Sequence, residues 1–405
     1  MAEVESGGLR RRLYLLAFID EFGPVYAVFT LWFSDNGIST SDVSTVFLVW
    51  AAIALALEIP SGALADRVDR RRVLASAFGI RALGIGLWFV WPTFLGALAG
   101  AALWATHSAI ASGSWEAMIH DELTSIGGER HYPKVMARVS QFSNLGVAAG
   151  TMLGAGLLQI GVGLPALGWI TVAAHAGSIT LVSRMPDVRW VAHGDDPEHR
   201  PGWSYAAWWA TLKAGLRQAR QAPLVAKLIA VGAMQEGLFV IDDYIPLVTR
   251  QRGGVDWNAS IVVLIVWIGL LAGGELAARR PNLSSGMLGT TMVIGSAVMA
   301  VALLLDRVWP LVLIAIGYGA FEATRIASDA RLQNRLPTAT RATVTSVRGF
   351  GSASISMAAF VLVGLMSDGD DPTPGLLVII SITAVAGILI IRWLPEYRRS
   401  PAPDR

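Results

Sequence analysis

Apolar residues recur along this chain in runs of about twenty, separated by short polar segments. A helix needs about 20 consecutive apolar residues to cross a membrane. The first half of the chain offers six such runs, predicted at residues 13–33, 43–64, 73–92, 94–117, 138–158 and 165–184. The second half offers six more, at residues 224–248, 259–278, 284–305, 310–328, 342–366 and 375–393. The pattern predicts an all-α membrane protein with twelve transmembrane helices in two pseudo-symmetric six-helix bundles.

A polar segment over residues 185–222 separates the two sets of six. We therefore expect an N-terminal bundle over residues 1–184 and a C-terminal bundle over residues 223–405, as in duplicated transporters. Within the linker, Tyr205 and Trp209 share one helical face with two leucines, beside a basic stripe. This pattern predicts an amphipathic helix in the cytoplasmic headgroup region. A linker helix packed on the bundle is the alternative.

The loop charges give an independent test of these spans, because basic loops stay on the cytoplasmic side of a membrane. Of the 32 Lys and Arg residues, 25 lie in or at the edges of the two termini and every second loop. The alternate loops hold three: Arg250, Arg252 and Arg307. Both termini are therefore expected to be cytoplasmic. Arginine greatly outnumbers lysine, which favours a GC-rich genome and a bacterial plasma (inner) membrane.

The composition excludes several classes of protein. Hydrophobic residues make up 54% of the chain and charged residues 15%, against about 25% charge in soluble domains. The chain has no cysteine, so disulfides and thiolate metal sites are excluded, and six scattered histidines leave little for a zinc site. We find no P-loop, HExxH or Gly-x-Ser-x-Gly motif and no basic tail. We expect no cofactor, no metal, no enzymatic activity and no nucleic-acid partner.

The loop after the second predicted span carries the most specific motif. It reads Gly62, three residues, Asp66, Arg67, one residue, Asp69, Arg70 and Arg71. Asp66 lies where we expect the next helix to begin, where a carboxylate can accept backbone N–H bonds. The loop resembles the signature of the major facilitator superfamily between its second and third spans, except that Asp69 replaces the second glycine.

This resemblance implies two six-helix bundles around a cavity that opens alternately to each side. It also implies that the acidic residue of the loop holds one conformation through a contact with the other half. Asp66 is the matching position, although it could be a simple helix cap. The residues expected to form this gating cluster are Glu58, Gly62, Asp66, Arg67, Arg70 and Arg71. We expect a monomer that binds a small-molecule substrate, protons and membrane lipid.

Ionisable residues inside the predicted spans are the candidates for mechanism, because charge at mid-bilayer is costly and usually marks an ion or substrate path. Asp20 and Glu21 in span one and Glu236 in span seven lie near the depth expected of a midplane site. By the resemblance, spans one, four, seven and ten line the cavity. We therefore predict that Asp20, Glu21 and Glu236 handle protons or a cationic substrate.

Further polar residues in the spans have both functional and structural interpretations. Glu116 is expected to pair with cytoplasmic-side arginines, and Glu322 with Arg325 at i,i+3 spacing. Gln141 and Asn144 in span five could bond a substrate or a neighbouring helix. Arg81 and Arg348 could face the cavity, bind lipid phosphate or neutralise a buried acid. His107 and His175 could relay protons or serve only in packing.

The acid-rich interior favours proton-coupled antiport that exports amphipathic or cationic small molecules. A glycine-rich span five, with Gly146, Gly150 and Gly154 at helix-packing spacing, only partly meets the antiporter signature because its Gly-Pro pair is missing. A proton symporter that imports a small metabolite is the alternative, since the same carboxylates would serve. A non-transporting receptor or a membrane-embedded enzyme is the alternative from another class.

Overall fold

The computed structural model describes residues 2–67, 69–125, 127–185, 223–334 and 338–396, together with residues 209, 210, 213 and 217. Within these ranges it describes the backbone but not the side chains of residues 2–7, 58–67 and 338–343. The chain divides into two compact units, Met1–Trp208 and Trp209–Arg405. The predicted amphipathic helix of the linker lies almost entirely outside the described residues.

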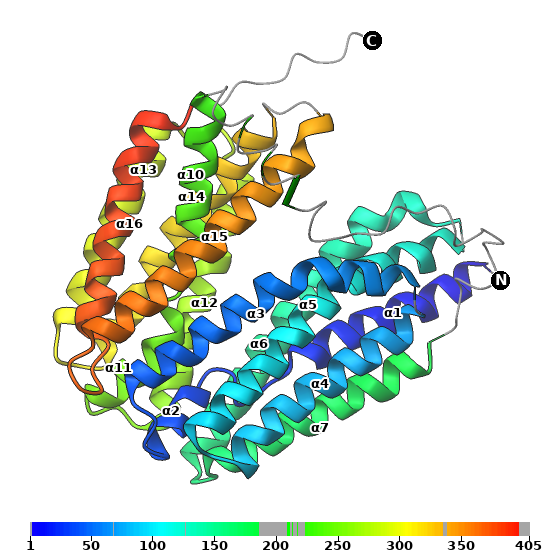
Figure 1. Ribbon diagram of the computed structural model, residues 1–405, viewed down its shortest axis with the longest axis horizontal. Coiled ribbons are helices and arrows are strands. Elements are labelled where there is room, and N and C mark those ends of the chain that lie inside the picture. The colour runs from blue at the N-terminus through cyan, green and yellow to red at the C-terminus, as the bar shows by residue number, and fades with distance from the viewer. Residues whose placement is uncertain are drawn as a thin grey trace. The chain divides into compact units, whose positions relative to one another are not determined.

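The first unit contains seven described α-helices, drawn from blue to green in Figure 1. They are α1 (Ala2–Glu21), α2 (Phe29–Asp35), α3 (Thr40–Arg67), α4 (Arg70–Val90), α5 (Phe94–Ser125), α6 (Tyr132–Gln159) and α7 (Leu164–Ser183), with a short 3-10 turn η1 (Glu129–His131) before α6.

The second unit is also helical, drawn from green to red. Its helices are α10 (Pro223–Gly237), α11 (Ile245–Gln251), α12 (Asp256–Arg279), α13 (Ser285–Leu304), α14 (Ile314–Gln333), α15 (Thr338–Met366) and α16 (Thr373–Trp393), with 3-10 turns η3 (Asp242–Tyr244) and η4 (Trp309–Leu313).

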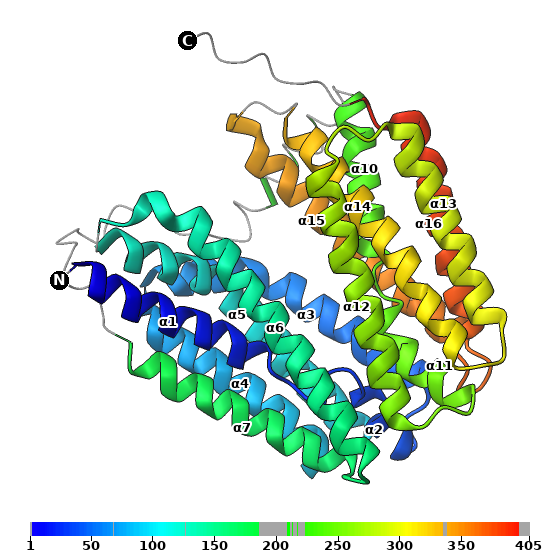
Figure 2. The ribbon, with the colours of Figure 1, turned by 180° about the vertical axis from the view of Figure 1, so that it is seen from behind.

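The two units repeat one scheme of helix packing. In the first, α1 packs on α6, α3 on α5 and α4 on α7. In the second, the helices at the same places in the order pack in the same way, α10 on α15, α12 on α14 and α13 on α16. Figure 2 shows α4 beside α7 and α13 beside α16 from the opposite side. Each half of the sequence therefore builds the same arrangement of helices.

Two of the predicted spans are broken, and they occupy matching places in the two units. Span one stops at Glu21, crosses a non-helical segment over residues 22–28 and resumes as α2. Span seven stops at Gly237 and resumes through η3 and α11. Pro24 explains the first break, because proline disfavours a helical conformation in the residue before it. Our prediction of an uninterrupted helix at each place is wrong.

Ten of the described helical segments are long and apolar enough to cross a membrane. Helices α1 and α6 are not among these ten. In α1 the charged residues Arg10, Arg11, Arg12, Asp20 and Glu21 lower the hydropathy. Both nevertheless pack within the first unit, where α1 lies on α6. The count of twelve spans remains a prediction.

Glycines make the contact between α6 and the broken span unusually close. A Cβ atom on Gly146 would lie 2.2 Å from the carbonyl oxygen of Phe18, and one on Gly154 would lie 2.5 Å from that of Pro24. Gly150 meets the backbone of Gly23 in the same way. Small residues let membrane helices approach to backbone contact. The glycine stripe of α6 therefore supports the end of α1 and the break that follows it.

Candidate functional site

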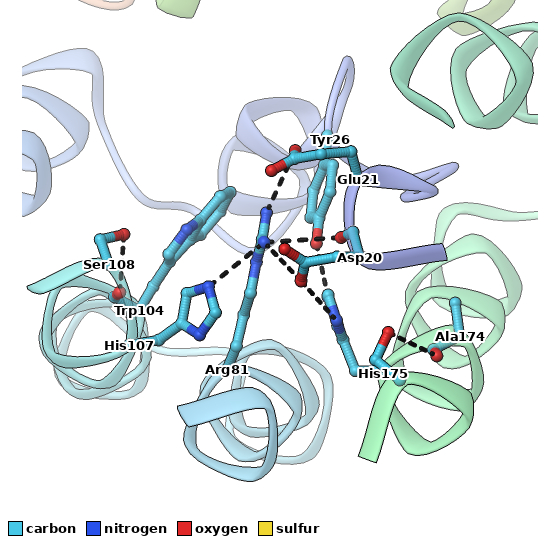
Figure 3. A network of polar contacts seen from close by, with 10 residues as sticks. Asp20, Glu21, Tyr26, Arg81, Trp104, His107, Ser108, Ala174 and His175 are labelled. Atoms are coloured by element: carbon cyan, nitrogen blue, oxygen red, sulfur yellow. Dashed lines mark hydrogen bonds and ion pairs between the residues drawn. The ribbon is translucent and has the colours of Figure 1, made fainter. Parts of the chain in front are cut away.

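A cluster of polar side chains surrounds Arg81 inside the first unit, and we call it the Arg81 cluster. Figure 3 shows the guanidinium at its centre, approached by side chains from α1, the segment after it, α5 and α7. The members of the Arg81 cluster are Asp20, Glu21, Tyr26, Arg81, Trp104, His107 and His175.

Arg81 binds the C-terminal end of α1. Its Nη1 donates to Oδ1 of Asp20 at 3.3 Å and lies 3.5 Å from the backbone oxygen of the same residue. Its Nη2 lies 3.8 Å from Oε2 of Glu21. The arginine side chain is only 6% exposed, whereas those of Asp20 and Glu21 are 21% and 35% exposed. One buried cation therefore serves two partly accessible carboxylates and a helix-terminal carbonyl group.

Aromatic rings and histidines enclose the rest of the guanidinium. The Arg81 guanidinium lies over the rings of Tyr26 and Trp104, 4.8 and 5.1 Å from their centres. Nε2 of His107 is 3.4 Å from Nη1 of Arg81. His175 lies beyond Asp20 (Figure 3). Cation–π contacts of this kind stabilise a buried guanidinium without neutralising its charge, so the charge of the cluster depends on its carboxylates.

A cavity of about 330 Å³ adjoins the Arg81 cluster within the first unit. Asp20, Glu21 and Arg81 line it on one side. The rest of the wall is aromatic and aliphatic, with some serine hydroxyl groups: Ala17, Leu74, Phe78, Trp104, His107, Ser108, Ala111, Ser112, Trp115 and Ser143. Ligand pockets are typically about 300–1,000 Å³, mostly apolar, with a few placed polar groups. The cavity has the size of a small-molecule site, and charged and hydroxyl groups supply much of its surface.

The second unit carries a different polar network, which we call the Glu236 cluster: Glu236, Glu322, Arg325, Asp329 and Arg348. Arg325 donates two hydrogen bonds of 2.7 Å to Glu322, the pair that the i,i+3 spacing predicts. Arg348 lies 3.1 Å from Oε1 of Glu236 and also binds Asp329. Arg325 approaches Glu236 at 3.9 Å. The network joins α10, α14 and α15.

Three other predicted residues lie apart from both clusters. Glu116 is exposed on α5, and no ion pair involves it in the described part of the chain; Asp121, five residues later, is the carboxylate that binds Arg70. Gln141 accepts a hydrogen bond of 3.0 Å from Arg138 on its own helix. Asn144 is partly buried on α6, and its neighbour Ser143 is the residue that lines the cavity.

The predicted gating segment is helical almost to its end. Helix α3 runs through Glu58, Gly62 and Asp66 to Arg67, so Asp66 lies in the last turn of α3 and not at the start of the next helix. The cap of α4 is Asp69, which accepts a hydrogen bond of 3.0 Å from the backbone N–H of Arg71. Our prediction for Asp66 as that cap is wrong.

The described arginines of this segment bind within the first unit. Arg70 binds Asp121 at the end of α5. Arg71 donates a hydrogen bond of 2.7 Å to the backbone oxygen of Met185, just after α7, and pairs with Asp69 at 2.9 Å. The aspartate that replaces the family's second glycine thus caps a helix and holds an arginine. The side chains of Glu58, Asp66 and Arg67 lie outside the described set.

Sequence reasoning missed Tyr26 and Trp104, because each contributes through a contact between segments distant in the chain. It also missed Asp329, which extends the Glu322–Arg325 pair along one face of α14 at i,i+4 from Arg325. One signal was available: Gly23 and Pro24 lie within three residues of Glu21, where they can end a helix. In transporters, interrupted helices at corresponding places in two halves indicate the binding site.

A duplicated helical bundle, interrupted helices at matching places and charged side chains at those interruptions define a secondary membrane transporter. The sequence profile of the Major Facilitator Superfamily matches residues 13–360. The chain therefore belongs to the Major Facilitator Superfamily, a family of transporters and not of enzymes.

Solved structures give the same fold at low sequence identity. The nucleoside transporter NupG superposes with a TM-score of 0.74 at 14% identity, covering 96% of this chain and 100% of that one. A bacterial homologue of the human lysosomal transporter Spinster gives 0.66 at 17%, covering 96% and 97%. A D-xylose-proton symporter gives 0.69 at 14%, covering 97% and 98%. No curated protein matches the sequence significantly. These likenesses establish the major facilitator fold.

Proposed function

We propose that this transporter is a proton-coupled antiporter that exports cationic or amphipathic small molecules. The observation that carries the proposal is that Asp20 and Glu21 share Arg81 at the wall of the 330 Å³ cavity. When both carboxylates are ionised, one negative charge is left without a cationic partner. Either a proton or a substrate cation can neutralise that charge, but not both at once, which is the physical requirement for exchange.

The cavity wall supports a substrate that is partly aromatic or aliphatic. Trp104, Trp115 and Phe78 offer flat apolar surfaces, and aromatic faces also attract organic cations. Protons and substrate would alternate at the carboxylates while the apolar part of the substrate contacts these rings. We assign coupling to Asp20 and Glu21. The sequence gives Glu236 the same role, but its contact with Arg348 at 3.1 Å favours a structural role.

A proton symporter that imports a small polar metabolite is the second candidate. Ser108, Ser112 and Ser143 line the same cavity, and their hydroxyl groups can bind a neutral, hydroxyl-rich molecule. The names of the nucleoside transporter and the D-xylose-proton symporter among the structural neighbours point the same way. The same carboxylates would then carry a proton inward together with the substrate.

The setting of the molecule is part of the proposal. We place it in a bacterial plasma membrane as a monomer with twelve spans, cytoplasmic termini and a cytoplasmic linker between bundles over residues 1–184 and 223–405. We further propose that Glu58, Gly62, Asp66 and Arg67 act in gating, and that Gln141 and Asn144 contact substrate from α6.

The test is transport by purified protein in liposomes with an imposed pH gradient. Ethidium serves as the cationic aromatic probe, and uridine and D-xylose as the neutral ones, with an enclosed pH-sensitive dye reporting proton movement. Antiport predicts that ethidium moves against the proton flux, and that Asp20→Asn abolishes this dependence on the gradient. Glu21→Gln should weaken it.

The matched control is Glu236→Gln, which leaves Arg348 with Asp329 and Arg325 with Glu322. We expect it to keep gradient-driven transport within about threefold of the wild type, less than 1 kcal/mol on the rate scale. Movement of uridine or xylose together with protons would replace antiport by symport. Transport of all probes without any gradient dependence would remove proton coupling altogether.

A further inference from the structure

His175 lies between the proposed coupling carboxylate and the break in span one. Its side chain on α7 is fully buried. Nε2 shares a hydrogen bond of 2.5 Å with the hydroxyl group of Tyr26, and Nδ1 faces Oδ1 of Asp20 at 3.8 Å (Figure 3). No described residue forms a hydrogen bond with Nδ1. The separation from Asp20 is one that a small rotation of the carboxylate or a bridging water closes.

The complete burial of His175 favours its neutral form, because a charged imidazole would lose its hydration. Asp20 and Glu21 approach from α1, Arg81 from α4 and His107 from α5, while Tyr26 belongs to the segment between α1 and α2. The buried guanidinium of Arg81 already supplies the positive charge of this cluster. It repels a second cation in surroundings where water screens little. His175 therefore acts as an uncharged imidazole with a single N–H group.

A neutral imidazole has two tautomers, and the two neighbours of His175 can stabilise either. An ionised Asp20 can only accept a hydrogen bond, so it favours the proton on Nδ1; Nε2 then accepts from the Tyr26 hydroxyl. A protonated Asp20 can donate to Nδ1, so the histidine proton lies on Nε2 and is donated to the Tyr26 oxygen. The two states differ by one proton in total, held by Asp20; His175 and Tyr26 keep the number they had.

Tyr26 links this tautomer to the backbone of the broken span. It lies within residues 22–28, two residues after Pro24, and its ring packs against Trp104 and the guanidinium of Arg81. One turn earlier on α7, Oγ1 of Thr171 accepts a hydrogen bond of 3.4 Å from the backbone N–H of Val25. Helix α7 therefore holds the break at two points, and only the point at His175 can respond to a proton.

We propose that His175 and Tyr26 read the protonation state of Asp20 and transmit it to the break in span one by reversing the direction of their hydrogen bond. This proposal rests on the proposed function, because it needs Asp20 to exchange a proton. When Asp20 is ionised, the Tyr26 hydroxyl donates to His175. When Asp20 is protonated, the Tyr26 oxygen accepts a hydrogen bond from His175. The hydroxyl group keeps its proton and can donate a hydrogen bond to another acceptor. Both residues are positioning residues for the coupling carboxylate.

Nitrogen-15 spectra of the full-length protein, labelled at histidine in lipid nanodiscs, distinguish the two tautomers. The His175 signal is assigned by its loss in His175→Gln. In the wild type we expect the Nδ1–H tautomer at high pH and the Nε2–H tautomer at low pH. In Asp20→Asn the side chain no longer changes its charge with pH, so a single tautomer should persist at every pH. A single unchanged tautomer in both proteins, or an imidazolium, would overturn the proposal.

Transport measurements give a second test that does not depend on Asp20 variants folding. Tyr26→Phe keeps the ring over Arg81 and removes only the hydroxyl group. We expect proton-driven ethidium transport about fivefold slower, ethidium binding at fixed pH unchanged, and no further loss in the double variant with His175→Gln. His120→Gln, which alters an exposed histidine on α5 outside the Arg81 cluster, should stay within about twofold. Additive losses in the double variant would refute a shared path.

The two proposals can fail separately. Wild-type transport that ignores the pH gradient would defeat proton coupling, whatever tautomer His175 adopts. Gradient-driven transport together with a tautomer that ignores the protonation of Asp20 would leave the antiporter standing and remove the role of His175 and Tyr26.

Discussion

The Arg81 cluster and the Glu236 cluster each include a carboxylate at the end of the first described helix of its unit, α1 or α10, yet they are built differently. In the first unit one arginine serves two carboxylates at 3.3 and 3.8 Å, and its other neighbours are aromatic rings and histidines. In the second, two arginines and three carboxylates form a chain of pairs, with two bonds of 2.7 Å between Arg325 and Glu322. The carboxylates of the Arg81 cluster are therefore paired more loosely than those of the Glu236 cluster.

This difference indicates a division of labour between the halves of a duplicated fold. The Arg81 cluster lines a cavity of about 330 Å³, so its carboxylates can meet protons and substrate. The cavity found in the second unit holds about 10 Å³ and lies against Phe239 and Tyr318 instead. Each arginine of the Glu236 cluster keeps a carboxylate if Glu236 is lost. We therefore propose that exchange takes place in the first unit and that the Glu236 cluster cross-links α10, α14 and α15 in the second.

Removing one arginine from each cluster should give the largest difference in stability between variants of the two clusters. Arg81→Met leaves two carboxylates in the cluster without a cation. Breaking a buried pair in this way costs about 3–5 kcal/mol. Arg325→Met leaves only one carboxylate without a cation, Glu322, because Glu236 retains Arg348. We expect it to cost about 2 kcal/mol, within the range for a buried group that loses its hydrogen-bond partner. Unfolding of the purified variants in detergent measures both.

The control for this prediction is the double variant Arg81→Met with Asp20→Asn. Asp20→Asn removes one of the two carboxylate charges that Arg81→Met leaves without a cation, so it should recover part of the lost stability. Transport should stay abolished, because the coupling carboxylate is gone. If Arg325→Met proves as damaging as Arg81→Met, the two clusters are equivalent and the division of labour is wrong.

The second prediction concerns the support beneath the Arg81 cluster. Gly146→Ala places a Cβ atom 2.2 Å from the carbonyl oxygen of Phe18, on the helix that ends at Asp20 and Glu21. Overpacking of this kind typically costs about 1–3 kcal/mol. We also expect slower transport, because the displaced helix carries the coupling carboxylates. Thermal unfolding and ethidium transport report the two effects.

Gly156→Ala is the matched control on the same helix, since a Cβ atom there meets nothing within 4 Å. It should leave stability and transport unchanged. The second unit offers the counterpart: Gly237→Ala places a Cβ atom 2.5 Å from that of Ile355, at the end of α10. Equal loss of stability but smaller loss of transport in Gly237→Ala would sharpen the contrast between the units. Equal loss of transport would remove it.

The sequence predicts the helical architecture well. The membrane requires runs of apolar residues and keeps loop arginines on the cytoplasmic side, so both signals can be recognised without tertiary information. It also predicts the Glu322–Arg325 pair from local spacing, whereas Asp20, Glu21 and Glu236 lie at the ends of broken helices that the hydropathy pattern did not reveal. Each of the confirmed inferences depends on residues close together in the chain.

The partners of Arg81 could not be predicted, because the contacts are between helices whose relative rotation depends on packing across the whole unit. The surroundings of Glu116 depend on the same packing: its triplet resembles that of Glu322, yet Glu116 is exposed and forms no ion pair in the described part of the chain. The break in span one was predictable in principle from Gly23 and Pro24. A hydropathy window averages over such positions and conceals them.

The smallest effect that we expect is on stability, from replacing the residues that cap corresponding helices in the two units. Asp69 caps α4 and also binds the side chain of Arg71 at 2.9 Å. Ser284 caps α13 by accepting a hydrogen bond of 3.1 Å from the backbone N–H of Met287. Replacing either by alanine removes a cap, which costs about 1 kcal/mol.

Asp69→Ala should cost slightly more than Ser284→Ala, because Arg71 loses a carboxylate while it still donates to the backbone oxygen of Met185. Because Arg71 is partly exposed, the added cost should be below about 1 kcal/mol. Asp69→Asn separates the two contributions, since asparagine caps a helix as well as aspartate but carries no charge. If Asp69→Asn is as destabilised as Asp69→Ala, the ion pair with Arg71 matters more than the cap. If it equals the wild type, capping alone explains why an aspartate stands where the family signature has glycine.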